Sequence, residues 1–377
     1  MIASAGARAA KRGLTPDAMA CHGAAWRDLA ARALEPSIFN DPGFAMPAAQ
    51  HLPGRRRPRF LLSWDPSDPA RLIGLCCVAP QGLVPLRSAW LHPQATAAFP
   101  LLDAAHAATA LADLLAQAGG PMRPAGLLLH GMPQHGATLQ LIAAQPGWTL
   151  VALDARSRAV VRQPPPPLPG KAGKEFRRQA RRLAEQGRVA TTVSAEPDDV
   201  DRFLAFEAAG WKGRRGTALG VTPRVARFTR TMAAALTAEE RCHVHSLTLD
   251  GRPIAMGVVL RAGPNAFFWK TSFDEAWARF SPGAHLTVAI GEAQARDPDV
   301  AMTDSCAVPG HSMIDRLWPE RMTVVDGVLA LTPTRRPSWS TGLLITAERL
   351  RRMARLRAKR VSAALRSRRH NATMAQP

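Results

Sequence analysis

Hydrophobic and polar positions follow two periods along this chain, and a run of prolines interrupts both. Before the prolines, short apolar stretches bounded by turn residues predict strands at 59–64, 72–78, 85–91, 126–130 and 148–161. The helical spacing of Ala and Leu predicts helices at 24–33, 101–118 and 137–144. Strands and helices that alternate in this way favour an α/β fold.

The same alternation continues after the prolines. Helices are expected at 174–187, 198–209, 221–236 and 284–295. Strands are expected at 189–193, 244–249, 254–260, 266–272, 300–305 and 324–331, and the turn Asp250–Pro253 predicts a β-hairpin. The first of these helices places four arginines on one face, which fits phosphate binding or, more commonly, a solvated surface: Arg177, Arg178, Arg181 and Arg182.

The prolines also mark the expected division into domains. Four successive prolines within Gln163–Gly170 have no N–H to donate, so neither a helix nor a central strand continues through them. A chain of 377 residues is long for one core. We therefore expect a domain at 1–162, a linker at 163–172, a second domain at 173–332 and a tail at 333–377.

Five segments of the second half occur in an order that resembles the GNAT superfamily of acyltransferases. They are the helix end Phe206–Lys212, the hairpin Leu247–Ala255, the aromatic strand Phe267–Asp274, the helix start Phe280–Leu286 and a strand ending at Asp304. The order is similar to the CelD/BcsL-type acetyltransferases linked to cellulose biosynthesis. It is also similar to the Fem-type transferases, which carry two GNAT-like domains in tandem. The resemblance covers about 171–320.

The resemblance implies an α/β fold of tandem GNAT-like domains, with mixed twisted sheets flanked by helices. The first domain would be a degenerate GNAT-like domain that shapes the acceptor cleft. The implied reaction is transfer of an acyl group from acetyl-CoA, or another acyl-CoA, to an amine or hydroxyl. The expected acceptor is a sugar, a polysaccharide precursor or a small amine.

Binding of an acyl-CoA needs free N–H groups that face its pyrophosphate, and a helix N-terminus supplies them. The segment Arg279–Ala284 begins such a helix, and the candidate donor-binding residues are Arg279, Ser281, Gly283 and Ala284. The GNAT pattern has glycine where this chain has Pro282. An ordinary Pro-Gly helix cap is the alternative.

Acyl transfer also needs a base that takes a proton from the nucleophile. Asp304 and His311 lie in a segment dense in polar residues, and Glu207 is a third candidate. A helix cap or a core-edge histidine is the alternative for His311. The chain contains no tyrosine, which excludes a tyrosine general acid.

A loop of charged and aromatic residues follows Glu207 and suits an acidic substrate. Trp211, Lys212 and Arg214 are its candidate substrate-binding residues, and a solvated surface loop is the alternative. Trp269 and Lys270, on the aromatic strand, are assigned the same binding role.

Metal and thiol chemistry have little support in the sequence. The five cysteines form no Cys-x-x-Cys pair, so neither a zinc site nor a disulfide framework is predicted. His243 and His245 share a strand face but lack an evident third ligand, which favours cross-strand packing and no bound metal. Cys306 with His311 is too weak a motif to predict a thiol nucleophile.

The net charge of +20 suggests two functions as alternatives to acyl-CoA-dependent transfer. From Arg335 to the end, twelve Lys or Arg residues against one Glu give +11, and a helix is expected over 341–370. Such a basic tail can contact RNA or anionic lipid. The alternatives are therefore an aminoacyl-tRNA-dependent Fem-type transferase and a non-enzymatic protein that binds nucleic acid or a membrane surface. No stable protein partner is inferred.

The location of the protein is predicted from two absences in the sequence. No stretch approaches the roughly 18 apolar residues of a membrane span. Residues 1–14 lack the apolar region of a secretory signal. The sequence therefore predicts a cytoplasmic protein.

Overall fold

The computed structural model describes residues 13–52, 57–80, 87–119, 126–196 and 198–331, with 342, 345–346 and 348–350. The basic tail and the helix expected over 341–370 lie outside the described residues, apart from those last six positions. Within the described part of the chain, no helix is long and apolar enough to cross a membrane.

The first half of the chain alternates strands with helices, as its hydrophobic pattern predicts. Its strands are β1 (Arg59–Trp64), β2 (Leu72–Pro80), β3 (Arg87–Ala89), β4 (Leu101–Leu102), β5 (Gly126–Pro133) and β6 (Trp148–Val161). Its helices are α2 (Pro16–Met19), η1 (Ala20–His22), α3 (Gly23–Ala31), η2 (Ile38–Asn40), α4 (Pro42–His51), α5 (Ala107–Ala118) and α6 (Ala137–Ala144).

The second half repeats this alternation. Its strands are β7 (Val189–Ser194), β8 (Cys242–Leu249), β9 (Arg252–Ala262), β10 (Asn265–Phe273), β11 (Met302–Asp304) and β12 (Arg321–Leu331). Its helices are α7 (Gly170–Ala184), α8 (Asp199–Ala209), α9 (Trp211–Arg214), η3 (Leu219–Val221), α10 (Pro223–Thr237), η4 (Glu275–Phe280), α11 (Pro282–Arg296) and α12 (Ile314–Leu317).

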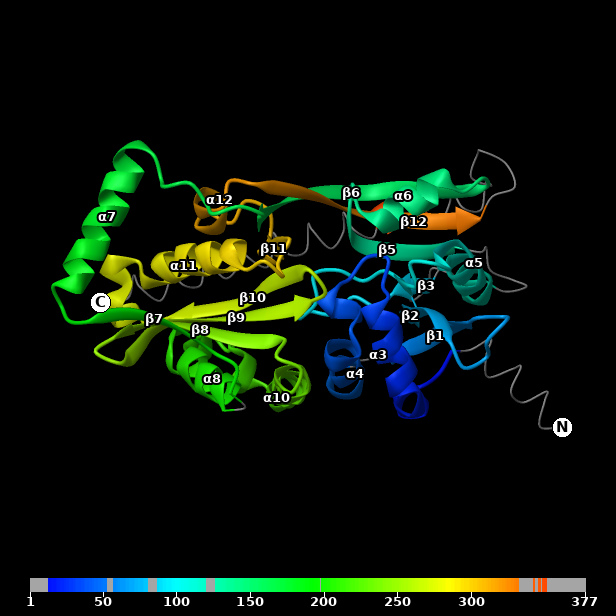
Figure 1. Ribbon diagram of the computed structural model, residues 1–377, viewed down its shortest axis with the longest axis horizontal. Helices are drawn as coiled ribbons and strands as arrows, with labels where there is room; N and C mark the ends of the chain where they lie inside the picture. The colour runs from blue at the N-terminus through cyan, green and yellow to red at the C-terminus, as the bar shows by residue number, and fades with distance from the viewer. Residues whose placement is uncertain are drawn as a thin grey trace, which may run out of the picture.

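The described strands join one twelve-stranded sheet in the order β1-β2-β3-β5-β12-β6-β11-β10-β9-β8-β7, and β4 pairs with β2. The pairs β3–β5 and β10–β11 are parallel, and the sheet is therefore mixed. In Figure 1, α11 lies on one side of β8–β10, and α8 and α10 lie on the other. The predicted α/β class, a mixed sheet flanked by helices, is confirmed.

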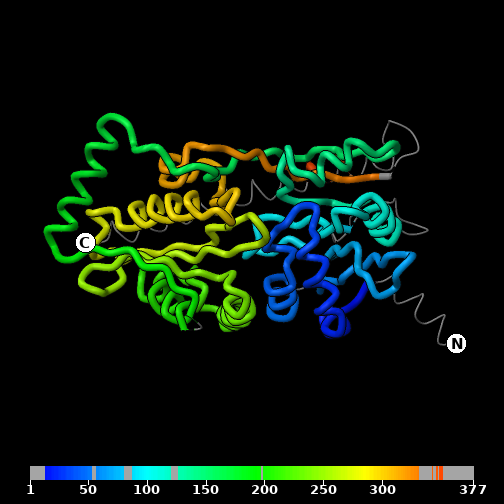
Figure 2. Tube along the Cα trace, in the orientation of Figure 1, coloured from blue at the N-terminus to red at the C-terminus, as the bar shows by residue number. Residues whose placement is uncertain are grey.

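Strand β6 joins the two half-sheets. Its residues Trp148–Ala159 pair with β12, and its last residues Val160 and Val161 pair with β11. Strand β12 comes from the end of the described chain, yet it lies between β5 and β6 (Figure 2). The second half of the chain therefore completes the sheet of the first.

Several expected elements differ in their bounds from those observed, and three of them are described here. The helix expected at 101–118 begins at Ala107, because Leu101 and Leu102 pair with β2 as the short strand β4. Helix α7 begins at Gly170, four positions before the expected 174. Strand β3 covers only Arg87–Ala89 of the expected 85–91.

The β-hairpin expected around Asp250 is confirmed. Leu249 pairs with Arg252, so Asp250 and Gly251 form a two-residue turn with φ values of 50° and 79°. Two positive φ angles are the mark of the turn type that best matches the twist of adjacent strands. Asp and Gly tolerate these angles, which explains the local sequence.

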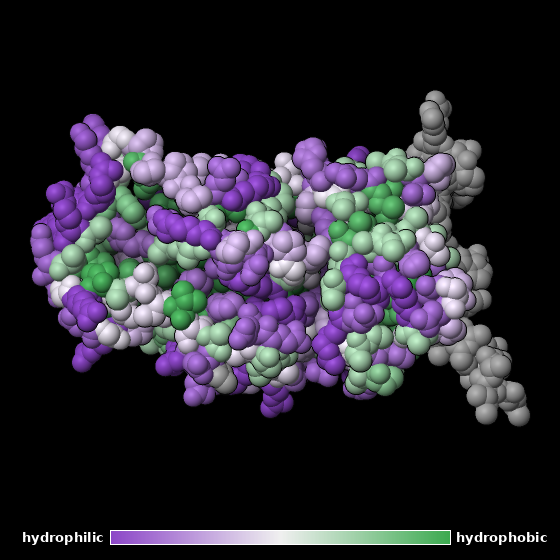
Figure 3. Space-filling view, in the orientation of Figure 1, coloured by the Kyte–Doolittle hydropathy of each residue, from purple (hydrophilic) through white to green (hydrophobic). Residues whose placement is uncertain are grey.

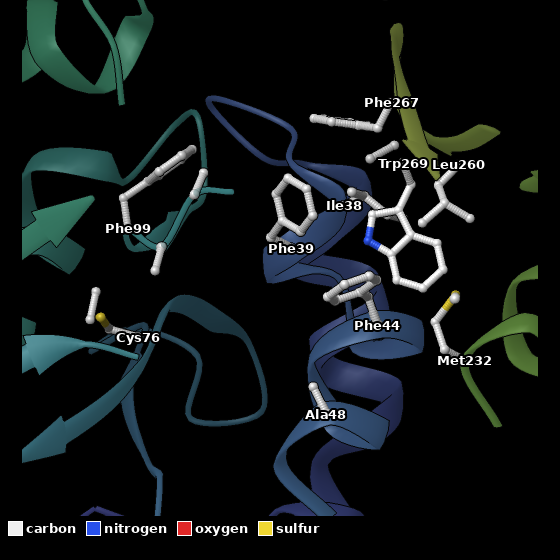
Figure 4. Close-up of a cluster of buried hydrophobic side chains, with 14 of the residues drawn as sticks. Ile38, Phe39, Phe44, Ala48, Cys76, Phe99, Met232, Leu260, Phe267 and Trp269 are labelled. Carbon is white, nitrogen blue, oxygen red and sulfur yellow. The ribbon is translucent and has the colours of Figure 1, made fainter. Parts of the chain in front are cut away.

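An aromatic cluster fastens the two halves together beneath this sheet. Phe44 of α4 lies edge-to-face with Phe228 of α10 at 5.3 Å and with Trp269 of β10 at 5.9 Å between ring centroids. Phe39 meets Phe267 at 5.4 Å in the same way (Figure 4). Edge-to-face pairs contribute about 0.5–1.5 kcal/mol each beyond the area they bury. The halves therefore share a core as well as a sheet.

Helix α7 lies at one end of the molecule and exposes a basic face, which is purple at the left of Figure 3. Leu183 is buried, and Phe176 stacks on His285 of α11 with 4.1 Å between ring centroids. The four arginines predicted to share one face of this helix are all exposed. Its exposed cations are Lys171, Lys174, Arg177, Arg178, Arg181 and Arg182.

Two buried histidines make the stability of this fold depend on pH. Burial lowers the pKa of His92 to about 3, with Lys270 adding to the shift, and burial lowers that of His245 to about 4. Both rings are therefore neutral in the folded state, whereas the unfolded chain takes up protons below the ordinary histidine pKa of about 6.5. Stability is complete above that pH and falls as the pH drops toward 4.

We expect the free energy of unfolding in urea to fall between pH 6.5 and 5 by about 1.4 kcal/mol per pH unit for each of these histidines. His92→Phe keeps an aromatic ring beside Phe44 and should reduce this slope. His135→Gln, at an exposed position, is the matched control. Equal slopes in the wild type and His92→Phe would contradict this origin of the pH dependence.

Candidate functional site

A cavity of about 390 Å³ lies between the two halves. We refer to it as the inter-half cavity. The segment after α3, the segment before β4 and the turn after β5 form its first-half wall, and the starts of β10, β11 and β12 form the second. Its lining residues include Glu35, Ser37, Phe39, Phe99, Gly136, Asn265, Phe267, Met302, Asp304, Arg321 and Thr323. Mixed apolar and polar walls of this kind are typical of small-molecule sites.

Glu35 is the acid–base candidate in this cavity. Its Oε2 accepts a hydrogen bond from the Thr138 N–H at 3.0 Å, which caps the start of α6. A Cβ on Gly136 would collide with the same carboxylate, so a side chain there would displace the Glu35 carboxylate from its present position. Burial raises the pKa of Glu35, and the hydrogen bonds from Thr138 offset part of that shift. A half-buried carboxyl with a raised pKa holds a proton more readily than an exposed one and is a candidate for acid–base chemistry.

Asp304 lines the same cavity but has both carboxylate oxygens engaged. Its Oδ2 accepts from Arg158 Nη1 at 2.7 Å, and its Oδ1 accepts from the Cys306 N–H at 2.8 Å. Arg158 also donates to Thr96 Oγ1 at 3.1 Å. Both members of the ion pair are less than 10% exposed. Asp304 therefore joins β11 to β6, and a role as base requires breaking that ion pair.

His311 and Cys306 lie elsewhere in the same segment. His311 Nδ1 accepts from the Ile314 N–H at 3.3 Å and so caps α12, which is the alternative expected for it. Neither residue lines the inter-half cavity. Burial raises the pKa of Cys306 far above the ordinary thiol range, with Asp304 adding to the shift. The thiol is therefore protonated, as expected for a residue without a nucleophilic role.

Glu207 organises the loop predicted to bind substrate. Its buried carboxylate accepts from Lys212 Nζ at 2.7 Å and from the Leu219 N–H at 2.7 Å. Lys212 Nζ also donates to the Thr271 carbonyl at 2.6 Å, which ties the loop to β10. The structure thus brings these predicted residues together, and their polar groups are used to hold the loop.

Two other predicted residues lie at the outer side of that loop. Arg214 forms an exposed ion pair with Glu275, at the start of η4. The Trp211 ring lies 5.2 Å from the Arg215 guanidinium. Both side chains remain accessible to a ligand from solvent.

Trp269 and Lys270 occupy a β-bulge in β10. The register shifts between Phe268 and Lys270, which leaves Trp269 opposite no partner residue. Trp269 Nε1 donates to the Gln94 carbonyl at 2.9 Å, across the boundary between the halves. The Lys270 amine lies 5.1 Å from the Trp269 ring and makes no hydrogen bond or ion pair with a described residue. Burial, with a contribution from Lys212, lowers its pKa.

The turn before α11 contains the four predicted donor-binding residues. Ser281 has φ 53°, and its N–H donates to the Ala278 carbonyl. The N–H groups of Ala284 and His285 both donate to the Ser281 carbonyl, and Pro282 has no N–H. Among the described backbone N–H groups of this turn, that of Gly283 makes no hydrogen bond outside the helix, and Gly283 is buried. Arg279 is exposed and lies over the Phe280 ring at 4.6 Å.

Residues 170–305 match a family model described as an acetyltransferase (GNAT) domain. This segment is therefore similar to GNAT domains. The match covers the segments whose order resembles that superfamily. It leaves the first half, with Glu35, outside the matched region.

Solved structures extend the likeness to both halves. FemX is 10% identical with a TM-score of 0.53, covering 82% of this chain and 96% of FemX. L-PGS from Bacillus licheniformis is 12% identical with a TM-score of 0.52, covering 89% and 98%. The C-terminal domain of a protein from Agrobacterium fabrum, assigned as a lysylphosphatidylglycerol synthetase, is 14% identical with a TM-score of 0.52, covering 83% and 92%. No curated protein matches the sequence.

At these identities the likeness describes the fold. The predicted similarity to GNAT and Fem-type proteins is confirmed, and it reaches beyond the GNAT domain into the first half. The CelD/BcsL-type branch stays a prediction, because neither the family model nor these structures distinguish it.

A Ser-His-Asp chain outside the GNAT match was not expected from the sequence. Ser88 Oγ lies 2.9 Å from His130 Nε2, and His130 Nδ1 lies 3.5 Å from Asp326 Oδ2. All three are buried, and none lines the inter-half cavity. Asp326 also binds Arg156, and these partners hold its pKa well below the usual range although burial alone would raise it. These three side chains therefore join β3, β5 and β12, and the buried Ser88 is not presented as a nucleophile.

We expect Asp304→Ala to lower the free energy of unfolding by about 3–5 kcal/mol, because it leaves the buried Arg158 guanidinium without its partner. Glu292→Ala removes the exposed ion pair with Arg296 and should cost less than about 1 kcal/mol. Urea unfolding followed by circular dichroism measures both. Equal losses would show that the buried ion pair does not hold the half-sheets together.

Proposed function

We propose that this protein is an acyltransferase that takes its acyl group from an aminoacyl-tRNA and passes it to an amine acceptor in the inter-half cavity. The observation that carries the choice of donor is the turn before α11. A CoA pyrophosphate needs several free amides at a helix start, and this turn leaves the Gly283 amide alone among its described N–H groups. The full-length likeness to FemX and to lysylphosphatidylglycerol synthetase proteins supports the same choice.

The reaction requires a base, and Glu35 fits that role best. The acceptor nitrogen attacks the ester carbonyl carbon, the bond from that carbon to the ribose oxygen breaks, and the ribose oxygen leaves with a proton. The Glu35 carboxylate takes the proton that the acceptor nitrogen loses and passes it to the departing ribose oxygen. Lys270 does not line the cavity but lies on β10, three positions after the cavity residue Phe267, and its amine is suited to binding a carbonyl or carboxylate oxygen of the substrate.

A second candidate is acyl transfer from acetyl-CoA, and the match of 170–305 to an acetyltransferase family favours it. In that case the Gly283 amide and Arg279 bind the donor phosphates. The acceptor would be the predicted sugar, polysaccharide precursor or small amine.

The two donors are separated by calorimetry with acetyl-CoA. We expect no binding to the wild type at millimolar concentration, since Pro282 removes an amide from the turn. Pro282→Gly restores that amide, and one hydrogen bond to a charged group is worth about 1.5–3 kcal/mol, so affinity should rise by about tenfold or more. Micromolar binding by the wild type, abolished by Gly283→Trp, would favour acetyl-CoA instead.

We expect Glu35→Gln to slow release of a labelled amino acid from charged tRNA to added amines by about 10²–10⁴-fold, because the base is lost. The amide still accepts the Thr138 hydrogen bond, so the urea midpoint should change little. The acidic limb of the pH–rate profile should disappear in the variant. His135→Gln, which changes another polar residue of the cavity wall, is the control. A Glu35→Gln enzyme with the wild-type rate would rule out this base.

A further inference from the structure

A second concave surface, which shares no lining residue with the inter-half cavity, carries an unusual charge. It is a groove of about 580 Å³ formed by the start of α2, the end of α4, the approach to β1 and the start of α10. Four arginines line it, and we refer to it as the basic groove: Arg57, Arg59, Arg224 and Arg227. The first two come from the first half of the chain and the other two from the second, so the groove exists only when the halves are joined.

These arginines have no partner among the residues that the structure describes. All four are exposed, and none forms a hydrogen bond, an ion pair or a ring contact with a described residue. Asp17 is the one acidic residue among the lining side chains. By contrast, Arg32, Arg156, Arg158 and Arg241 all pair with carboxylates elsewhere in the described chain. Like charges gathered in one groove repel each other unless an anion lies between them.

The lining chemistry favours phosphodiesters over lipid. A guanidinium offers a planar fork of donors that matches a phosphate, and Thr15 and Gln50 can bond to sugar oxygens. The lining contains no Phe, Trp, Leu, Ile or Met to enter a bilayer, and a concave groove does not match a flat membrane. It also contains no aromatic ring besides His51 on which bases could stack. The surface therefore suits a nucleic-acid backbone read without regard to sequence.

We propose that the basic groove binds the phosphodiester backbone of RNA. This inference rests on the proposed function and gives the tRNA donor its place on the protein. Helix α4 links the groove to the catalytic region: His51 at its end lines the groove, and Phe39, just before its start, lines the inter-half cavity. A ten-residue helix is about 15 Å long. Roughly four or five stacked nucleotides, at the helical rise of about 3.4 Å each, span that length.

Binding of a fluorescent deacylated tRNA to the full chain, followed by anisotropy over a range of salt, tests the groove. The test variant is Arg224→Gln with Arg227→Gln. The matched control is Arg177→Gln with Arg181→Gln on α7, which removes the same charge from another exposed helix. We expect the groove variant to bind at least tenfold more weakly, with a salt slope smaller by about 1.5. The α7 variant should lose less than threefold. Both keep the basic tail, and circular dichroism checks their folding.

Equal losses in the two variants would overturn the groove, because charge alone would then explain binding. Retained RNA binding with lost binding to vesicles of phosphatidylglycerol would overturn it in favour of a membrane surface. An assay of labelled amino-acid transfer then shows whether the donor proposal or the groove proposal has failed. RNA bound through the groove without transfer by the wild type overturns the donor proposal alone. Transfer that survives in the groove variant, with unchanged tRNA affinity, overturns the groove alone.

Discussion

The buried ion pair between Arg158 and Asp304 is the interaction on which the rest of this structure depends. Arg158 lies near the end of β6, where that strand leaves β12 and begins to pair with β11. Asp304 ends β11 and faces the inter-half cavity. Burying two charges away from water costs stability unless each charged group is ion-paired and hydrogen-bonded. The pair therefore fixes the junction of the half-sheets, and with it the width of the cavity between them.

Most helices and strands could be predicted because the residues that determine them are neighbours in the sequence. The Asp250–Gly251 turn, the arginine-bearing face of α7 and the Pro-Gly start of α11 each depend on residues adjacent in sequence. The bounds of α5 were missed because Leu101 and Leu102 pair with β2, and hydrophobic periodicity does not encode a strand partner. The place of β12 between β5 and β6 could not be predicted for the same reason, because periodicity does not show which strands pair.

The residues of the candidate site also divide into those that the local sequence identified and those that only the fold brings together. The sequence identified Glu207 with its loop, and the structure joins Glu207 to Lys212 as a support for that loop. Glu35 was missed because its raised pKa comes from burial, and the segment around Thr138 that it contacts lies about a hundred positions away. The four groove arginines likewise come from two distant segments. A site made of residues from distant segments cannot be recognised in a single sequence, because only the fold brings those residues together.

The position of β12 has a consequence for synthesis on the ribosome. Strands β5 and β6 emerge early, yet the strand that separates them ends at Leu331, 170 positions after Val161. At about 5–20 residues per second, the gap in the first half-sheet stays open for roughly 10–30 s. During that interval two strand edges are available to the wrong partner, including each other. A nascent chain of this design therefore gains from a chaperone that shields β5 and β6 until translation is nearly complete.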